Sequence, residues 1–176
     1  MNTARILILI VYIVCIILFT VGYAAMPILK QEPAPGIKHV IYIDRQETSM
    51  NTPGAPVNTT IKFDSLGGTA KTLGLAILLT CIAITILLAV SVVISYLGLK
   101  RISYITLLPA VIAMGLVFSV LIIMITDNVI SNKIKDMVSI SPVKIEKNLD
   151  YDTGFLLMSI AACLSIVMFP VYRYMG

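Results

Sequence analysis

Four long apolar runs constrain the fold of this chain more than any other feature. Each is long enough to cross the hydrocarbon core of a bilayer as a helix, which takes about 20 residues. None of them contains Asp, Glu, Lys, Arg or His. The runs cover residues 6–29, 72–99, 102–126 and 153–171. They predict an all-α membrane protein, a bundle of four transmembrane helices forming one membrane domain over residues 1–176, with the lipid bilayer as its first partner.

Composition agrees with a membrane protein and excludes some other classes. The chain is 59% hydrophobic and 12% charged, whereas soluble domains are about 45–50% apolar and about 25% charged. The net charge of +4 comes from scattered basic residues, so we expect no nucleic-acid partner. All three cysteines lie inside the apolar runs, which excludes an external domain held together by disulfides.

The placement of Lys and Arg predicts the orientation. Arg5 precedes the first run, Lys100 and Arg101 separate the second from the third, and Arg173 follows the fourth, with no acidic residue beside any of them. Cytoplasmic segments carry an excess of Lys and Arg. We therefore expect both termini in the cytoplasm and both long loops, about residues 30–71 and 127–152, on the exoplasmic side.

Both external loops contain segments with the character of β-strands. Residues 37–44 are rich in β-branched and aromatic side chains, and residues 59–64 and 143–147 alternate apolar with polar positions. Three strands with one apolar face can persist where two are marginal. We expect a small antiparallel β-sheet, formed by the two external loops and seated on the bundle. The side chains expected to face inward are Ile61, Phe63, Val143 and Ile145.

The sequence contains no recognisable catalytic or metal-binding motif. His39 is the single histidine, and a metal site needs several ligands at matched spacing. Asp44, Glu47 and Asp64 could meet on the sheet, although scattered carboxylates are typical of a solvated surface. We therefore predict that the protein is not an enzyme and has no catalytic residue, metal or cofactor.

Small residues recur four positions apart in three of the runs. Such spacing places both members on one helix face, where they allow two backbones to approach closely. Packing inside the protein's own bundle is the first interpretation, and packing against another subunit is the alternative. The candidate helix-packing pairs are Ser91 with Ser95, Gly115 with Ser119, and Ala161 with Ser165.

Two prolines lie within the runs. Pro109 is expected to kink the third span, because proline removes a backbone hydrogen bond and clashes with the preceding turn. Pro170 is expected to help terminate the fourth span.

One modification motif is present in the first predicted loop. Asn58-Thr59-Thr60 is an N-glycosylation sequon. Asn58 would be modified only in a eukaryotic secretory pathway, and three-residue sequons often arise by chance.

The predicted strands at 37–44, 59–64 and 143–147, together with the tight Lys100-Arg101 turn, give a layout that resembles the claudin and PMP-22 class of tetraspan proteins. The resemblance is one of topology, since the chain has no tryptophan and no loop cysteine with which to form that class's motif. It implies cytoplasmic termini, a sheet formed from both loops, and a role in cell contacts or in a paracellular pore.

Three functions are compatible with the sequence. The first is a non-enzymatic accessory or assembly subunit of a larger membrane complex, which fits helices without ionisable groups and with small-residue faces. The alternative is a claudin-like cell-contact or pore protein that associates with itself, with Lys38, Asp44, Lys62 and Asp64 setting its contacts. The second alternative is a small channel or transporter component, for which Pro109 marks the place to look.

Overall fold

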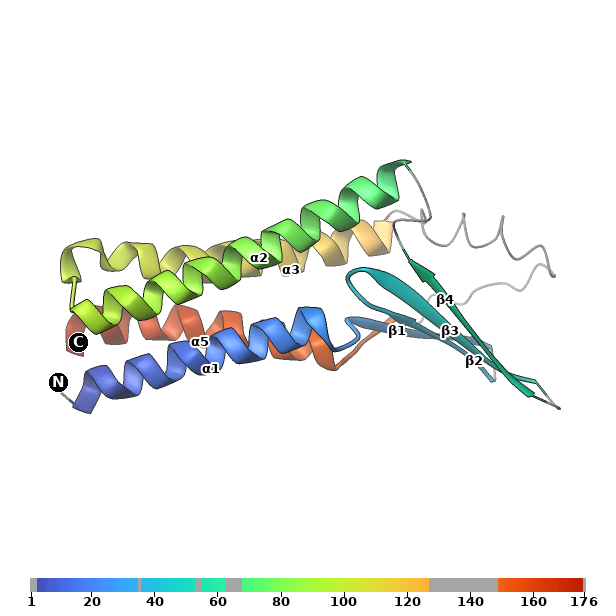
Figure 1. The fold of residues 1–176 in the computed structure, drawn as a ribbon, viewed down its shortest axis with the longest axis horizontal. Helices are drawn as coiled ribbons and strands as arrows, with labels where there is room; N and C mark the ends of the chain where they lie inside the picture. The colour runs from blue at the N-terminus through green and yellow to red at the C-terminus, as the bar shows by residue number, and fades with distance from the viewer. Residues whose placement is uncertain (1–2, 35, 53–54, 63–67, 127–148, 176) are drawn as a thin grey trace.

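Helices and sheet occupy different ends of the molecule. The computed structural model describes residues 3–34, 36–52, 55–62, 68–126 and 149–175. Long helices lie side by side, a β-sheet extends from one end of them, and both chain termini lie at the opposite end (Figure 1). We call these two places the sheet end and the termini end.

The helical part consists of long apolar helices that pack on one another. In the described residues these are α1 (Thr3–Ala24), α2 (Gly68–Leu97), α3 (Leu108–Thr126) and α5 (Thr153–Met175). Helix α1 packs against α2 and α5, and α3 packs against the same two helices. We call these packed helices the bundle.

Three helices are long and apolar enough to cross a membrane. The stretches concerned are Arg5–Ala24, Leu75–Leu97 and Thr153–Tyr174. They correspond to the first, second and fourth predicted runs, and they fit an integral, multi-pass membrane protein. Within the described part of the chain, α3 is not among them, so a fourth membrane crossing is not shown by the structure.

The first span ends earlier than predicted. Helix α1 stops at Ala24, and Leu29 already belongs to a β-strand. The reason is Pro27, which has no N–H to donate and disfavours the helical conformation of the residue before it. Hydropathy alone could not place this boundary, because residues 25–29 are as apolar as the helix.

The third predicted run is not a single α-helix. Residues Lys100–Leu107 form a 3-10 helix, η2, with non-helical angles at Ile102. Helix α3 begins at Leu108, so Pro109 lies in its first turn rather than in its interior. The first N–H groups of a helix have no intrahelical partner, so proline is tolerated there. Pro109 lies at the junction of η2 and α3, and the kink expected there stays a prediction.

The expectation that Pro170 helps to terminate the fourth span is wrong. It lies inside α5, which continues to Met175. A proline in a helix frees the carbonyl of the residue four positions earlier, and membrane helices tolerate this where neighbouring groups satisfy the backbone.

A small antiparallel sheet is confirmed. The strands are β1 (Leu29–Ala34), β2 (Ile37–Ile41), β3 (Arg45–Thr52), β4 (Ala55–Lys62) and β5 (Leu149–Tyr151). Their spatial order is β4-β3-β2-β1-β5, and all neighbours are antiparallel. Strand β5 comes from the segment predicted as the second loop, so the two segments do meet in one sheet.

The predicted strands overlap the observed ones only in part. Strand β2 ends at Ile41, three residues before the predicted end, and β4 starts four residues before the predicted start at 59. Strands β1, β3 and β5 were not predicted. The strand predicted at 143–147, with Val143 and Ile145, lies outside the described residues, as does Phe63, whereas Ile61 is half-buried against the core.

Backbone contacts fasten the sheet to the bundle. The Gly154 N–H donates to the Pro27 carbonyl at 2.8 Å, and the Asp152 N–H donates to the Ile28 carbonyl at 3.0 Å. A methyl group on Gly154 would lie 2.6 Å from the Gly22 carbonyl oxygen. Helices α1 and α5 therefore cross in backbone contact at the sheet end, which only residues without a side chain allow.

Apolar side chains from the sheet complete this junction. Leu29, Ile41 and Ile43 are buried and belong to the same core as Phe19 of α1. Ile43 lies in the turn between β2 and β3, so the tip of that hairpin is buried next to the helices. The sheet is thus a continuation of the helical core and not a separate domain.

Candidate functional site

The structure separates the small-residue pairs into an inner and an outer set. Ser91, Ser95, Ala161 and Ser165 are all buried at 1% exposure or less. The Ser91 hydroxyl donates to the Leu87 carbonyl at 2.9 Å, and Ser165 donates to Ala161 at 2.8 Å. These residues lie where helices of the same chain pack together.

The remaining pair lies on the outside of α3. Gly115 and Ser119 are exposed, and a methyl group built on Gly115 would meet nothing within 4 Å. The Ser119 hydroxyl donates to the Gly115 carbonyl at 2.7 Å, so its proton is already bonded within the helix. This pair forms a neutral place on α3 with small side chains, which no other described residue covers.

Large apolar side chains lead up to this place. Leu108, Val111 and Ile112 are exposed, Val111 by 56%. Positions 108, 112, 115 and 119 follow the four-three-four spacing of one helix face. We call the surface formed by Leu108, Val111, Ile112, Gly115 and Ser119 the α3 outer face.

The interior of the bundle is more polar than the sequence indicated. Near the termini end, the buried Tyr172 hydroxyl donates to the Ile94 carbonyl at 3.0 Å, and Thr106 donates to the Ser103 carbonyl at 2.6 Å. Tyr172 lies near the end of α5, where tyrosines commonly act as anchors at the membrane interface. Its 0% exposure instead makes it a buried link between α5 and α2.

Three buried hydroxyls have no hydrogen-bond partner in the part of the chain that the structure describes. They belong to Tyr12, Thr20 and Ser95. Thr106 lies beside Tyr12, but it already donates its proton to Ser103 and its contact with Tyr12 falls short of hydrogen-bond geometry. Ionisable or clustered polar side chains at membrane depth usually mark function, but these hydroxyls are neutral and dispersed.

A polar cluster lies on one face of the sheet. His39 Nδ1 is 2.8 Å from Thr48 Oγ1 and 3.2 Å from Gln46 Nε2. Gln46 is 4% exposed, and its Oε1 has no partner among the described residues. Burial lowers the pKa of His39 below its ordinary value of 6.5, so the ring is neutral at physiological pH. The described residues contain no group of three or more His, Cys, Asp or Glu that could hold a metal.

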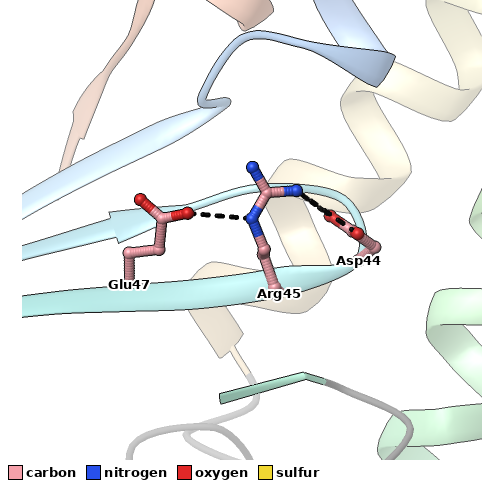
Figure 2. Close-up of polar contacts among 3 residues, drawn as sticks. All are labelled: Asp44, Arg45 and Glu47. Carbon is pink, nitrogen blue, oxygen red and sulfur yellow. Dashed lines mark hydrogen bonds and ion pairs between the residues drawn. The ribbon is translucent and has the colours of Figure 1, made fainter. Parts of the chain in front are cut away.

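The carboxylates near the β2–β3 turn are paired with an arginine. Arg45 Nε donates to Glu47 Oε1 at 2.9 Å, and Arg45 Nη1 donates to Asp44 Oδ1 at 3.1 Å (Figure 2). The guanidinium also lies 4.0 Å above the Tyr42 ring. The hydrogen bond to Glu47 raises the pKa of Arg45. The third carboxylate of the sequence-based hypothesis, Asp64, lies outside the described residues.

Two further predicted positions have a clear place in the fold. Asn58 is exposed on β4, an edge strand of the sheet. Pro109 is fully buried in the first turn of α3. Neither residue makes a contact that would form a ligand site.

Sequence comparison does not indicate a function for this chain. No protein-family model matches the chain, and no curated protein matches it. The surfaces of this fold are therefore the features that bear on its function.

Proposed function

We propose that this protein is an accessory or assembly subunit of a larger membrane complex and that it binds a helix of a partner subunit at the α3 outer face. The observation that carries the proposal is the open space at Gly115. Glycine in a helix interior costs about 1 kcal/mol relative to alanine. The other two small-residue pairs are used inside the chain, but among the described residues Gly115 makes no close contact.

Helix packing in lipid gives that open space a use. Lipid tails are as apolar as leucine, so helices associate in membranes through close van der Waals packing at small residues. The α3 outer face has two small residues, Gly115 and Ser119, beside larger exposed apolar side chains. A partner helix could approach closely there without any polar group having to be satisfied, since Ser119 is bonded to its own helix.

The proposed arrangement has four membrane crossings. Helix α3 has 19 residues, which at about 1.5 Å per residue gives about 28 Å, close to the 30 Å hydrocarbon core. The termini and the connection from α2 to η2 lie together at one end (Figure 1), and Lys100, Arg101 and Arg173 are there. This placement supports cytoplasmic termini and an exoplasmic sheet.

Gentle extraction tests the proposal. The tagged protein should leave the membrane in mild detergent with a stoichiometric partner. Gly115→Leu should abolish that association while leaving the melting temperature of the protein itself unchanged, because the new side chain points into open space. Ala83→Leu is the matched control, since Ala83 is an exposed small residue on α2 and its enlargement should leave the partner bound.

Recovery of the wild-type protein as a lone monomer under the mildest conditions would contradict a subunit role. Equal loss of the partner in both leucine variants would contradict the assignment to the α3 outer face.

A claudin-like, self-associating protein is the second candidate. The observation that favours it is the sheet, in which β5 from one predicted external segment pairs with β1 from the other. The edge strand β4 is exposed at Val57 and Asn58, so the sheet offers a surface for contacts. A homo-oligomer without other subunits, and enrichment at contacts between expressing cells, would favour this function over the first.

A further inference from the structure

The termini end carries positive charge with no acidic counterpart in sequence. Arg5, Lys100, Arg101 and Arg173 belong to it, whereas all nine acidic residues of the chain fall between positions 32 and 152. Lys100, Arg101 and Arg173 are exposed, and water can solvate them. Arg5 differs from these three, because it is half-buried where α1 begins.

The Arg5 guanidinium is packed against the end of α2. A methyl group on Gly98 would lie 2.8 Å from Arg5 Nη1 and 3.2 Å from Arg5 Nη2. Gly98 has a positive φ of 69° and follows the last residue of α2, the left-handed position at which helices commonly end on glycine. This glycine thus ends the helix and also leaves the room in which the guanidinium lies.

The charge of Arg5 is not compensated within the described residues. Arg5 Nε is buried and has no hydrogen-bond partner there, and no ion pair of the described residues includes Arg5. The phenol of Tyr172 is close enough to Arg5 to interact with it, but it carries no opposite charge at neutral pH. A charged group removed from water is costly unless an opposite charge and hydrogen bonds accompany it.

We propose that Arg5 binds the phosphate of an anionic phospholipid, with Lys100 and Arg101 adding to the attraction. Guanidinium groups bind phosphate through two parallel N–H donors. The Lys100 N–H donates to the Gly98 carbonyl at 3.0 Å, which holds the backbone of Lys100 beside the glycine against which Arg5 packs. Basic residues at the ends of membrane helices are a known means of recognising anionic headgroups.

The surroundings favour a lipid over free phosphate. Ile6 and Leu7, directly after Arg5, are exposed by 43% and 61%, and Leu97 and Leu99 on either side of Gly98 are exposed by 58% and 43%. Apolar surface therefore begins immediately beside the guanidinium. One phospholipid supplies both the phosphate and the acyl chains that such a boundary requires, whereas inorganic phosphate supplies only the first.

Native mass spectrometry of the full chain tests this inference. Protein in a neutral detergent is titrated with phosphatidylglycerol, and the bound lipid is counted. Arg5→Gln should weaken the tightest lipid by about tenfold, as expected for loss of charge-assisted hydrogen bonds. Arg173→Gln, which removes an exposed charge at the same end, should change that affinity by less than about twofold.

Other arms of the experiment distinguish the sources of attraction. Arg5→Lys keeps the charge but loses the two-donor geometry and should give an intermediate affinity; it also replaces Arg5→Gln if that variant does not fold. Phosphatidylcholine and inorganic phosphate should each bind or stabilise less than phosphatidylglycerol. Equal weakening by Arg5→Gln and Arg173→Gln would reduce the effect to diffuse charge and overturn the site.

Inorganic phosphate that competes as well as the lipid would overturn the choice of a lipid ligand. The site is independent of a partner at the α3 outer face, since Arg5 and Gly115 lie on different helices. The leucine variants at Gly115 and Ala83 should therefore retain wild-type lipid binding.

Discussion

The two ends of the bundle differ in how the charge of an arginine is compensated. At the sheet end, Arg45 is bonded to two carboxylates and lies over an aromatic ring. At the termini end, Arg5 lies against a glycine and has a buried Nε without a partner among the described residues. The same group is neutralised by the protein in one place and left for the surroundings in the other. At the sheet end, the protein itself supplies the groups that compensate the charge of Arg45. At the termini end, in our proposal, an anionic lipid compensates the charge of Arg5.

Glycine substitutions should give the largest contrast between the ends. Gly154→Ala places a methyl group 2.6–2.8 Å from three backbone carbonyl oxygens, which cannot rotate away. We expect a loss of about 2 kcal/mol or more. Gly98→Ala meets the flexible end of Arg5 and requires a left-handed residue other than glycine, which costs about 1 kcal/mol.

Thermal unfolding in mild detergent, followed by circular dichroism at the helix band, measures both effects. The Gly154→Ala midpoint should fall by about 4–8 °C, since 1 kcal/mol corresponds to about 2–4 °C in a chain of this length. Gly115→Ala is the control, because a methyl group there meets nothing and improves helix propensity. A midpoint for Gly154→Ala at or above that of Gly98→Ala would show that the α1–α5 crossing is not tightly closed.

Two buried tyrosine hydroxyls in the bundle differ in whether a described residue accepts their hydrogen bond. Tyr172→Phe removes a buried hydrogen bond to the Ile94 carbonyl and should cost about 1 kcal/mol. Tyr12→Phe removes a buried hydroxyl that has no partner, so it should leave the unfolding midpoint unchanged or raise it. If both variants lose the same stability, the Tyr12 hydroxyl is satisfied by something that the chain itself does not provide, such as ordered water.

The spans were predictable because hydropathy and length report them directly, but their boundaries were set by single residues. Pro27 ends the first helix early, and Gly98 supplies the left-handed end of the second. Both signals are visible in the sequence and outweigh the apolar residues around them. The 3-10 helix η2 has no such signal: residues 102–107 are less apolar than the helix that follows, but they contain no proline, glycine or charge that would mark a boundary.

Strand β3 illustrates what local sequence could not reveal. Its residues, Arg45–Thr52, include Gln, Glu and Asn and have little intrinsic strand preference. It is a strand because β2 and β4 pair with it on both sides. Likewise, the spacing of Gly115 and Ser119 predicted that they share a helix face. Only the packing of α3 against α2 and α5 shows that this face points outward.

The sheet should be sensitive to acid where the bundle is not. Burial lowers the pKa of His39, so the unfolded chain binds its proton more readily than the folded one as pH falls through about 6.5. This stabilising contribution is complete above that pH and is lost as the pH falls toward the lowered pKa of the folded state. Hydrogen exchange of the β2 and β3 amides, corrected for its intrinsic pH dependence, should accelerate as the pH falls from 7.5 to 5.5.

The control for the pH effect is His39→Gln, which keeps a hydrogen-bonding side chain beside Gln46 and Thr48 but has no charge to gain. Its exchange rates, corrected for intrinsic pH dependence, should be flat over the same window. Acceleration of equal size in the variant would assign the effect to other groups.

The smallest expected change in the unfolding midpoint concerns the two arginines. Arg45→Gln breaks two ion pairs at the protein surface, each worth about 0.2–1 kcal/mol at most and reduced by salt. With both pairs near the lower end of that range in salt, we expect a loss of about 0.5 kcal/mol in all, which lowers the unfolding midpoint by about 1–2 °C, equally in neutral detergent and in the presence of phosphatidylglycerol. Arg5→Gln should behave in the opposite way, with no loss in neutral detergent and with loss of the stabilisation that phosphatidylglycerol gives the wild type. Lipid-dependent stability of Arg45→Gln would mean that charge at the sheet end also depends on the surroundings, and the contrast between the ends would fail.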